Sequence, residues 1–85
     1  MNTLKIELIE KIDYDDFERM WIRLTCGSEV REVCFEPCTD GTWAYLDGDY
    51  EPLMPDHVKK AWDSIEGDNA LTSIWNGNCT EYIIE

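Results

Sequence analysis

The sequence predicts an α+β fold, in which a mostly antiparallel sheet of about five or six strands packs against one helix. Residues 3–9 alternate between apolar and polar side chains, which is typical of a half-buried strand. Residues 18–36 fit a β-hairpin, and residues 55–66 carry apolar side chains at helical spacing. Because no linker, repeat or low-complexity tract interrupts the chain, we expect a single domain over residues 1–85.

The hairpin is predicted from its turn and from its cross-strand pairs. The dipeptide Gly27-Ser28 suits a two-residue loop between strands over 18–26 and 29–36, because a type II′ turn takes glycine first. Opposite charges and apolar side chains stabilise a strand pair when they face each other. The expected register places Arg23 opposite Glu32, Arg19 opposite Glu36, and Ile22 opposite Val33.

A helix is the alternative for residues 15–25. One helical face would hold Tyr14, Phe17, Trp21 and Leu24, after a possible capping box from Asp15 to Glu18. We choose the hairpin, because its register joins two pairs of opposite charge and because residues 20–26 are rich in β-favouring types.

Turn residues and helical spacing organise the second half of the chain. We expect a turn at Asp40-Gly41, with Pro37 at the end of the incoming strand or on an edge, and a loop over residues 47–52. The helix over 55–66 would begin with Pro55 at its first position and stop at Gly67. Its apolar face is formed by Val58, Ala61, Trp62 and Ile65.

The last segment is predicted as a hairpin, because Asn76-Gly77 favours a tight turn between strands over 71–75 and 79–84. A short helix over 68–76 is the alternative. Large aromatic side chains dominate the core energetics of small domains. We therefore expect the core to contain Trp21, Phe35, Trp43, Trp62 and Trp75, together with aliphatic residues at alternate strand positions.

Composition excludes several classes of protein. The hydrophobic fraction of 44% is too high for a disordered chain, and no apolar run approaches the roughly 18 residues of a membrane span. No apolar leader is visible, so we expect a cytoplasmic protein without membrane contact. Cys26, Cys34, Cys38 and Cys79 include no Cys-x-x-Cys pair, and we expect reduced thiols with no metal and no cofactor.

Catalytic motifs are absent from the sequence. The sole histidine, His57, lies at the start of the predicted helix beside Asp56, with no nucleophile near it in sequence. No phosphate-binding loop, nucleophile elbow or zinc-protease motif occurs. We therefore expect no catalytic residue, and a protein that is not an enzyme.

Charge is the feature that predicts a function. Nineteen acidic residues against seven basic ones give a net charge of −12. Such a charge steers a protein toward positive surfaces, and tyrosine is enriched at the centres of interfaces. We expect a basic nucleic-acid-binding protein or complex as partner, with no direct contact to nucleic acid. The predicted partner-binding residues are Asp13, Tyr14, Asp15, Asp16, Glu18, Asp47, Asp49, Tyr50 and Glu51.

In size and charge the chain resembles small inhibitory proteins that block nucleic-acid-handling enzymes. These include phage-encoded DNA mimics, anti-CRISPR and anti-restriction proteins, and nuclease immunity proteins. The resemblance implies occlusion of a basic cleft by carboxylates that imitate phosphates, and it assigns no site residues because it rests on composition. The alternatives are a small cysteine-based metal or redox domain and a self-assembling structural subunit, whose charge would serve solubility.

Overall fold

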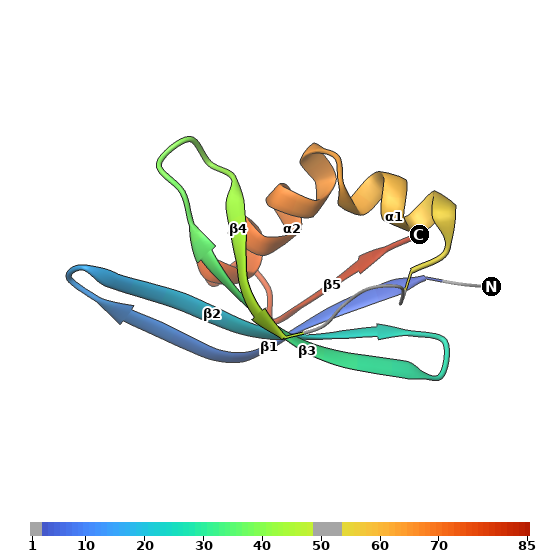
Figure 1. Cartoon of the computed structure of the whole chain (residues 1–85), viewed down its shortest axis with the longest axis horizontal. Helices are drawn as coiled ribbons and strands as arrows, with labels where there is room; N and C mark the ends of the chain where they lie inside the picture. Colours follow the sequence, from blue (N-terminus) through green and yellow to red (C-terminus); the bar gives the residue numbers. More distant parts are fainter. Residues whose placement is uncertain (1–2, 49–53) are drawn as a thin grey trace.

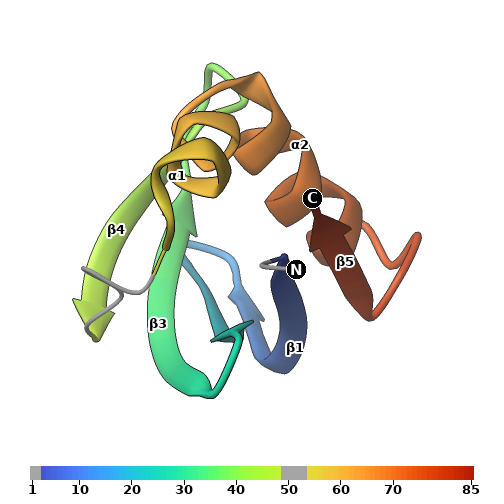
Figure 2. The same ribbon diagram turned by 90° about the vertical axis from the view of Figure 1, so that its right-hand side faces the viewer.

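The structure is a computed structural model that describes residues 3–48 and 54–85 (Figure 1). These residues form one antiparallel sheet in the order β4-β3-β2-β1-β5. The elements are β1 (Leu4–Tyr14), β2 (Phe17–Cys26), β3 (Glu29–Pro37), β4 (Trp43–Gly48), α1 (Asp56–Trp62), α2 (Ile65–Trp75) and β5 (Glu81–Ile84). Both helices lie over the same face of the sheet (Figure 1, Figure 2). The α+β class with an antiparallel sheet is confirmed, but the described residues form two helices where one was predicted.

Strand β1 is longer than the strand predicted over residues 3–9, because it continues through a β-bulge to Tyr14. The pairing with β2 shifts between Leu8 and Glu10, which leaves Ile9 as the extra residue. Leu8 faces the helices before the bulge, and Lys11 faces them after it. The alternation that predicts the strand therefore breaks at the bulge while the strand itself continues.

The hairpin between β2 and β3 is confirmed with the predicted register. Ile22 pairs with Val33 and Arg23 pairs with Glu32. Three residues before Ile22 on β2, Arg19 Nη1 lies 2.9 Å from Glu36 Oε2. Gly27 adopts a φ of 63°, as a glycine-first turn requires. Residues 17–26 are therefore strand, and the helical alternative is wrong.

The turn at Asp40-Gly41 is also confirmed, and it leads into the edge strand β4. Asp40 Oδ1 accepts hydrogen bonds from Thr42 Oγ1 at 2.6 Å and from the Thr42 backbone N–H at 3.1 Å. These hydrogen bonds lower the pKa of the Asp40 carboxyl, and the one from the Thr42 side chain has the larger effect. At the far end of β4, Gly48 has a φ of 95°, and a Cβ there would collide with the backbone of Glu32. Only glycine fits this position.

The predicted helix over 55–66 is two helices that meet at Ser64. Ser64 caps α2, because its Oγ accepts a hydrogen bond from the Glu66 backbone N–H at 3.2 Å. The prediction that Gly67 ends a helix is wrong, because Gly67 lies inside α2. Pro55 is the N-cap residue of α1 and not its first helical position. The break allows α2 to turn over the sheet instead of continuing along α1.

The predicted hairpin at Asn76-Gly77 is wrong, and the helical alternative for that segment is closer to the structure. Gly77 follows α2 with a φ of 80°. Its N–H bonds to the carbonyl of Ile74 at 3.2 Å, and the N–H of Asn78 bonds to the carbonyl of Ser73 at 3.0 Å. This is a Schellman motif, in which a left-handed glycine terminates a helix. Asn-Gly therefore ends a helix here, and β5 pairs with β1 instead.

The core lies between the helices and the covered face of the sheet. Phe35 and Trp62 are buried as predicted, and Trp43 and Trp75 are half-buried against the core. The prediction for Trp21 is wrong, because its partners on the neighbouring strands place it on the uncovered face. The other core residues are Leu4, Ile6, Met20, Ile22, Leu24, Cys26, Val33, Val58, Ala70, Leu71, Ile74 and Ile84. No helix in the described part of the chain has the length and apolar character to cross a membrane.

Candidate functional site

The turn between β1 and β2 gathers four carboxylates and two aromatic rings at one end of the molecule. We call residues 13–18 the acidic tip. Asp13 is paired opposite Glu18, and Tyr14 opposite Phe17, so the charges and the rings come from both strands. All six residues are exposed, and the two rings keep 69% and 46% of their surface accessible. Figure 1 shows this hairpin extending to the left, beyond the helices.

The charge of the acidic tip is not neutralised by neighbouring cations. Across residues 3–48 and 54–85, none of its four carboxylates has an ion-pair partner. Arg19 is adjacent, but its Nη1 donates to the backbone carbonyl of Glu18 at 2.7 Å and lies 2.9 Å from Glu36 Oε2. Asp13 and Glu18 face each other as like charges, which destabilises a strand pair. A local cost of this kind is typical of a functional site.

Lys11 connects the base of this hairpin to the helical layer. Its ammonium donates a hydrogen bond to the carbonyl of Trp75 at 2.7 Å, and it lies 4.2 Å from the centroid of the Trp75 ring. The carbonyl belongs to the last residue of α2, where the helix dipole favours a cation. The contact attaches β1, just beyond its bulge, to the end of α2. The acidic tip therefore projects from a part of the hairpin that is anchored to the helical layer.

The second predicted cluster is only partly within the described residues. Asp47 is exposed near the end of β4, and its Oδ1 accepts a hydrogen bond from the Gly48 backbone N–H at 2.8 Å. It shares a row of the sheet with Cys34 and Trp21. Strand spacing and rise place Asp47 about 14 Å from Glu18 at the base of the acidic tip. Asp49, Tyr50 and Glu51 lie outside the described residues.

The uncovered face of the sheet carries both signs of charge. Arg23 Nη2 lies 3.4 Å from Glu32 Oε2. Lys5 Nζ lies 3.3 Å from Glu81 Oε2 and 3.8 Å from Glu7 Oε2. Because these cations alternate with the acids, the sheet face is not the negative surface that the composition suggests. The acidic tip, in contrast, places four adjacent carboxylates together without a described ion pair.

The four cysteines are free thiols at separate places in the fold. Cys26 lies in the core and Cys34 on the opposite face of the sheet, beside Trp21. Burial raises the pKa of both thiols. A raised pKa disfavours the thiolate that metal binding and nucleophilic attack need. Within the described ranges, no three metal-ligating side chains form a group, so the arrangement lends no support to the cysteine-based alternative.

His57, the only histidine, is exposed in the first turn of α1. No hydrogen bond joins it to another side chain in the part of the chain that the structure describes. General acid–base catalysis needs a partner within hydrogen-bond reach. The described residues therefore supply no catalytic arrangement around it.

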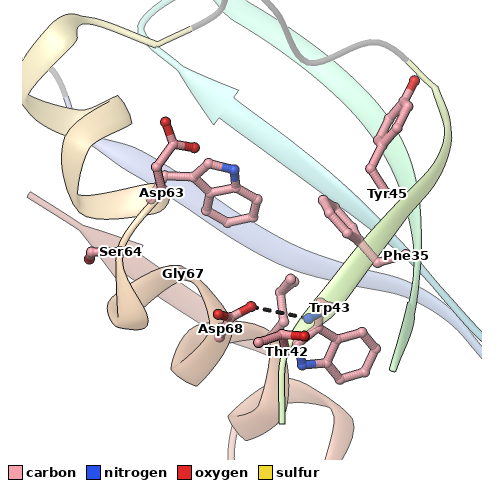
Figure 3. A pocket seen from close by; sticks show the side chains of 10 residues that line it. Phe35, Thr42, Trp43, Tyr45, Asp63, Ser64, Gly67 and Asp68 are labelled. Atoms are coloured by element: carbon pink, nitrogen blue, oxygen red, sulfur yellow. Dashed lines mark hydrogen bonds between the residues drawn. The ribbon is translucent and has the colours of Figure 1, made fainter. Parts of the chain in front are cut away.

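A pocket that sequence reasoning missed lies between the α1–α2 junction and strands β3 and β4 (Figure 3). Its lining includes four aromatic residues, Phe35, Trp43, Tyr45 and Trp62, and two carboxylates, Asp63 and Asp68. The residues come from segments far apart in the sequence, so only the tertiary structure brings them together. No family model, curated protein or solved structure matches this chain.

Proposed function

We propose that this protein is a non-enzymatic inhibitor that acts as a nucleic-acid mimic. Its acidic tip would dock on a basic surface that normally holds DNA or RNA and would exclude the nucleic acid from it. The observation that carries this proposal is the set of four exposed carboxylates without ion-pair partners among the described residues, at the end of an elongated molecule of 40 × 21 × 21 Å. Phage anti-CRISPR, anti-restriction and nuclease immunity proteins are the functional class that this mode of action suggests.

The density of charge at the tip supports the mimicry. The paired carboxylates of Asp13 and Glu18 lie two residues from Asp15 and Asp16 along the hairpin. At about 3.3 Å per residue, the four charges occupy about 7 Å of hairpin axis. A DNA duplex carries about four phosphate charges in the same length, at one per ~1.7 Å. A row of Lys and Arg side chains built for phosphates would therefore meet a similar density of negative charge.

Tyr14 and Phe17 provide the apolar contact that charge alone lacks. Both rings are exposed beside the carboxylates, and Arg19 lies 4.3 Å from the Phe17 ring centroid. Aromatic side chains near the centre of an interface contribute much of the binding free energy, whereas charges chiefly set the rate of association. Tyr14 was expected from the sequence as an anchor. Phe17 was not predicted as a binding residue, although its position as an aromatic residue next to an Asp-rich turn could have indicated this role.

The proposal is tested by capturing the partner and measuring association. Immobilised protein is exposed to a cell lysate at low salt, and proteins that elute as salt rises are identified and purified. The variant Asp15→Lys/Asp16→Lys should then bind the partner at least about 10-fold more slowly than the wild type, because steering depends on these charges. Nucleic acid should compete with the wild-type protein for the partner.

The matched control is Glu29→Lys/Glu85→Lys, which changes the net charge equally. Both residues are exposed and lie away from the acidic tip, Glu29 at the β2–β3 turn and Glu85 at the C-terminus. The control should associate at close to the wild-type rate. Equal effects of the two double variants, or a partner that binds nucleic acid and this protein together, would overturn the proposal.

A further inference from the structure

The pocket between the α1–α2 junction and strands β3 and β4 has an aromatic floor and an acidic rim. Its volume is about 250 Å³. Phe35, Trp62 and Leu71 are buried and form the floor, while Tyr45 and Asp63 are exposed at the rim. Figure 3 shows Phe35 and Tyr45 on the strand side and Asp63 and Asp68 on the helix side. A bound group would therefore contact rings from both sides and carboxylates from the helix side.

The rings of this pocket meet at steep angles. The centroids of Phe35 and Trp62 lie 5.9 Å apart with an interplanar angle of 65°. Those of Phe35 and Tyr45 lie 6.2 Å apart with an angle of 76°. In such edge-to-face pairs one ring covers part of the other, and Phe35 and Trp62 are buried, so an organic cation entering from the rim would first contact the 46% exposed ring of Tyr45.

Each rim carboxylate uses one oxygen in a described contact. Asp68 Oδ1 accepts a hydrogen bond from the Trp43 backbone N–H at 3.1 Å, which fixes the side chain against β4. Asp63 Oδ2 lies 3.3 Å from Lys59 Nζ in an exposed pair. Because an exposed ion pair stabilises a protein little, a better-placed cation can compete with Lys59. The two carboxylates thus favour a cation that can donate several hydrogen bonds.

We propose that this pocket binds the guanidinium group of an arginine side chain. Guanidinium is planar, stacks on aromatic faces, and presents five donors that match carboxylate oxygens. It is also less strongly hydrated than the ammonium of lysine, so an aromatic floor suits it better. That the arginine belongs to the partner protein rests on the proposed function, since surfaces that hold nucleic acid are rich in arginine.

Binding to the pocket is tested on the isolated protein by NMR titration with Nα-acetyl-arginine methylamide. The indole N–H resonances of Trp43 and Trp62 should shift in a saturable way, with half-saturation in the mM range. Two further probes, the citrulline and lysine analogues, should bind at least about 5-fold more weakly. Equal binding of citrulline would overturn the role of charge, and equal binding of lysine would overturn the preference for guanidinium.

The variant Asp63→Asn/Asp68→Asn separates charge from shape, because asparagine at position 68 keeps the acceptor for the Trp43 N–H. This variant should bind the arginine probe at least about 5-fold more weakly than the wild type. Asp15→Asn/Asp16→Asn removes the same charge from the acidic tip, and we expect wild-type titration from it. If both double variants lower the affinity for the arginine probe equally, the net negative charge of the protein attracts the probe, and the assignment to the pocket fails.

The same two variants keep this inference distinct from the proposed function. With the purified partner, both should bind more weakly than the wild type, the tip variant through slower association and the pocket variant through faster dissociation. If the wild type binds the arginine probe as expected but the pocket variant binds the partner normally, the arginine is not supplied by the partner, and the proposed function stands provided that the tip variant is slowed. An unresponsive pocket with a slowed tip variant would overturn the pocket alone.

Discussion

Gly67 lies where the backbone of Trp62 contacts the first turn of α2. A Cβ at position 67 would collide with the Trp62 carbonyl oxygen, so any other residue would push the two helices apart. The ring of Trp62 forms part of both the core and the pocket floor. The absence of a Cβ at Gly67 therefore allows α1 and α2 to approach closely, and through the position of Trp62 it affects the shape of the pocket.

We expect Gly67→Ala to lower the free energy of unfolding by about 2 kcal/mol, because overpacking outweighs the helix propensity that alanine adds. Chemical denaturation measures the change. Asn69→Ala is the control, since Asn69 is exposed on the same helix, and it should leave stability unchanged or slightly raised. A Gly67→Ala protein as stable as the wild type would show that the helices separate without cost.

At the scale of elements, the β1–β2 hairpin extends farther than the strands around it. β1 has 11 residues and β2 has 10, whereas β5 covers only the first part of β1, from Leu4 to Glu7. Beyond the bulge, the described contact that joins β1 to the helical layer is the one from Lys11 to Trp75. On the β1 side of the hairpin, Lys11 thus supplies the attachment to α2, while pairing with β3 and the Arg19–Glu36 ion pair hold the β2 side.

The variant Lys11→Met should remove this attachment while keeping an apolar stem. We expect the free energy of unfolding to fall by about 1 kcal/mol, since both the charged hydrogen bond and the cation–π contact are lost at an exposed site. Amide hydrogen exchange in residues 10–19 should rise. Lys60→Met is the control, because Lys60 is exposed and has no described ion pair. Unchanged exchange in the hairpin would show that the sheet alone holds it.

At the scale of the whole molecule, a net charge of −12 on 85 residues opposes the compact state. The described ion pairs are exposed or half-buried, so they offset little of this repulsion. Salt screens like-charge repulsion over distances near the Debye length, about 10 Å at 0.1 M. The isolated protein and its complex should therefore respond to salt with opposite signs.

Raising NaCl from about 20 to about 300 mM should increase the Tm of the isolated protein by a few degrees. The same change should weaken the complex with a basic partner. Calorimetry of the free protein and association kinetics of the complex measure the two effects. The Glu29→Lys/Glu85→Lys variant, with less repulsion to screen, should gain less in Tm. A Tm that falls with salt would mean that the ion pairs dominate stability.

The β2–β3 hairpin was predictable in detail because its determinants are local. Arg23 and Glu32 are nine residues apart and meet across one turn. The bulge at Ile9, the capping role of Ser64 and the use of Asn76-Gly77 as a helix end were not predictable. The hydrogen bonds at Ser64 and Gly77 are local, but the same residues fit another structure equally well, and packing against distant segments decides between the two.

The candidate site divides in the same way. The sequence by itself determined that acids cluster at residues 13–18 and that the chain is strongly negative, because both follow from composition and order. Only the tertiary structure decided that the cluster lies at the end of a hairpin, that Trp21 faces away from the core, and that Phe35, Tyr45 and Trp62 meet Asp63 and Asp68 in one pocket. Contacts between distant segments depend on three-dimensional packing, which side-chain periodicity along one segment does not encode.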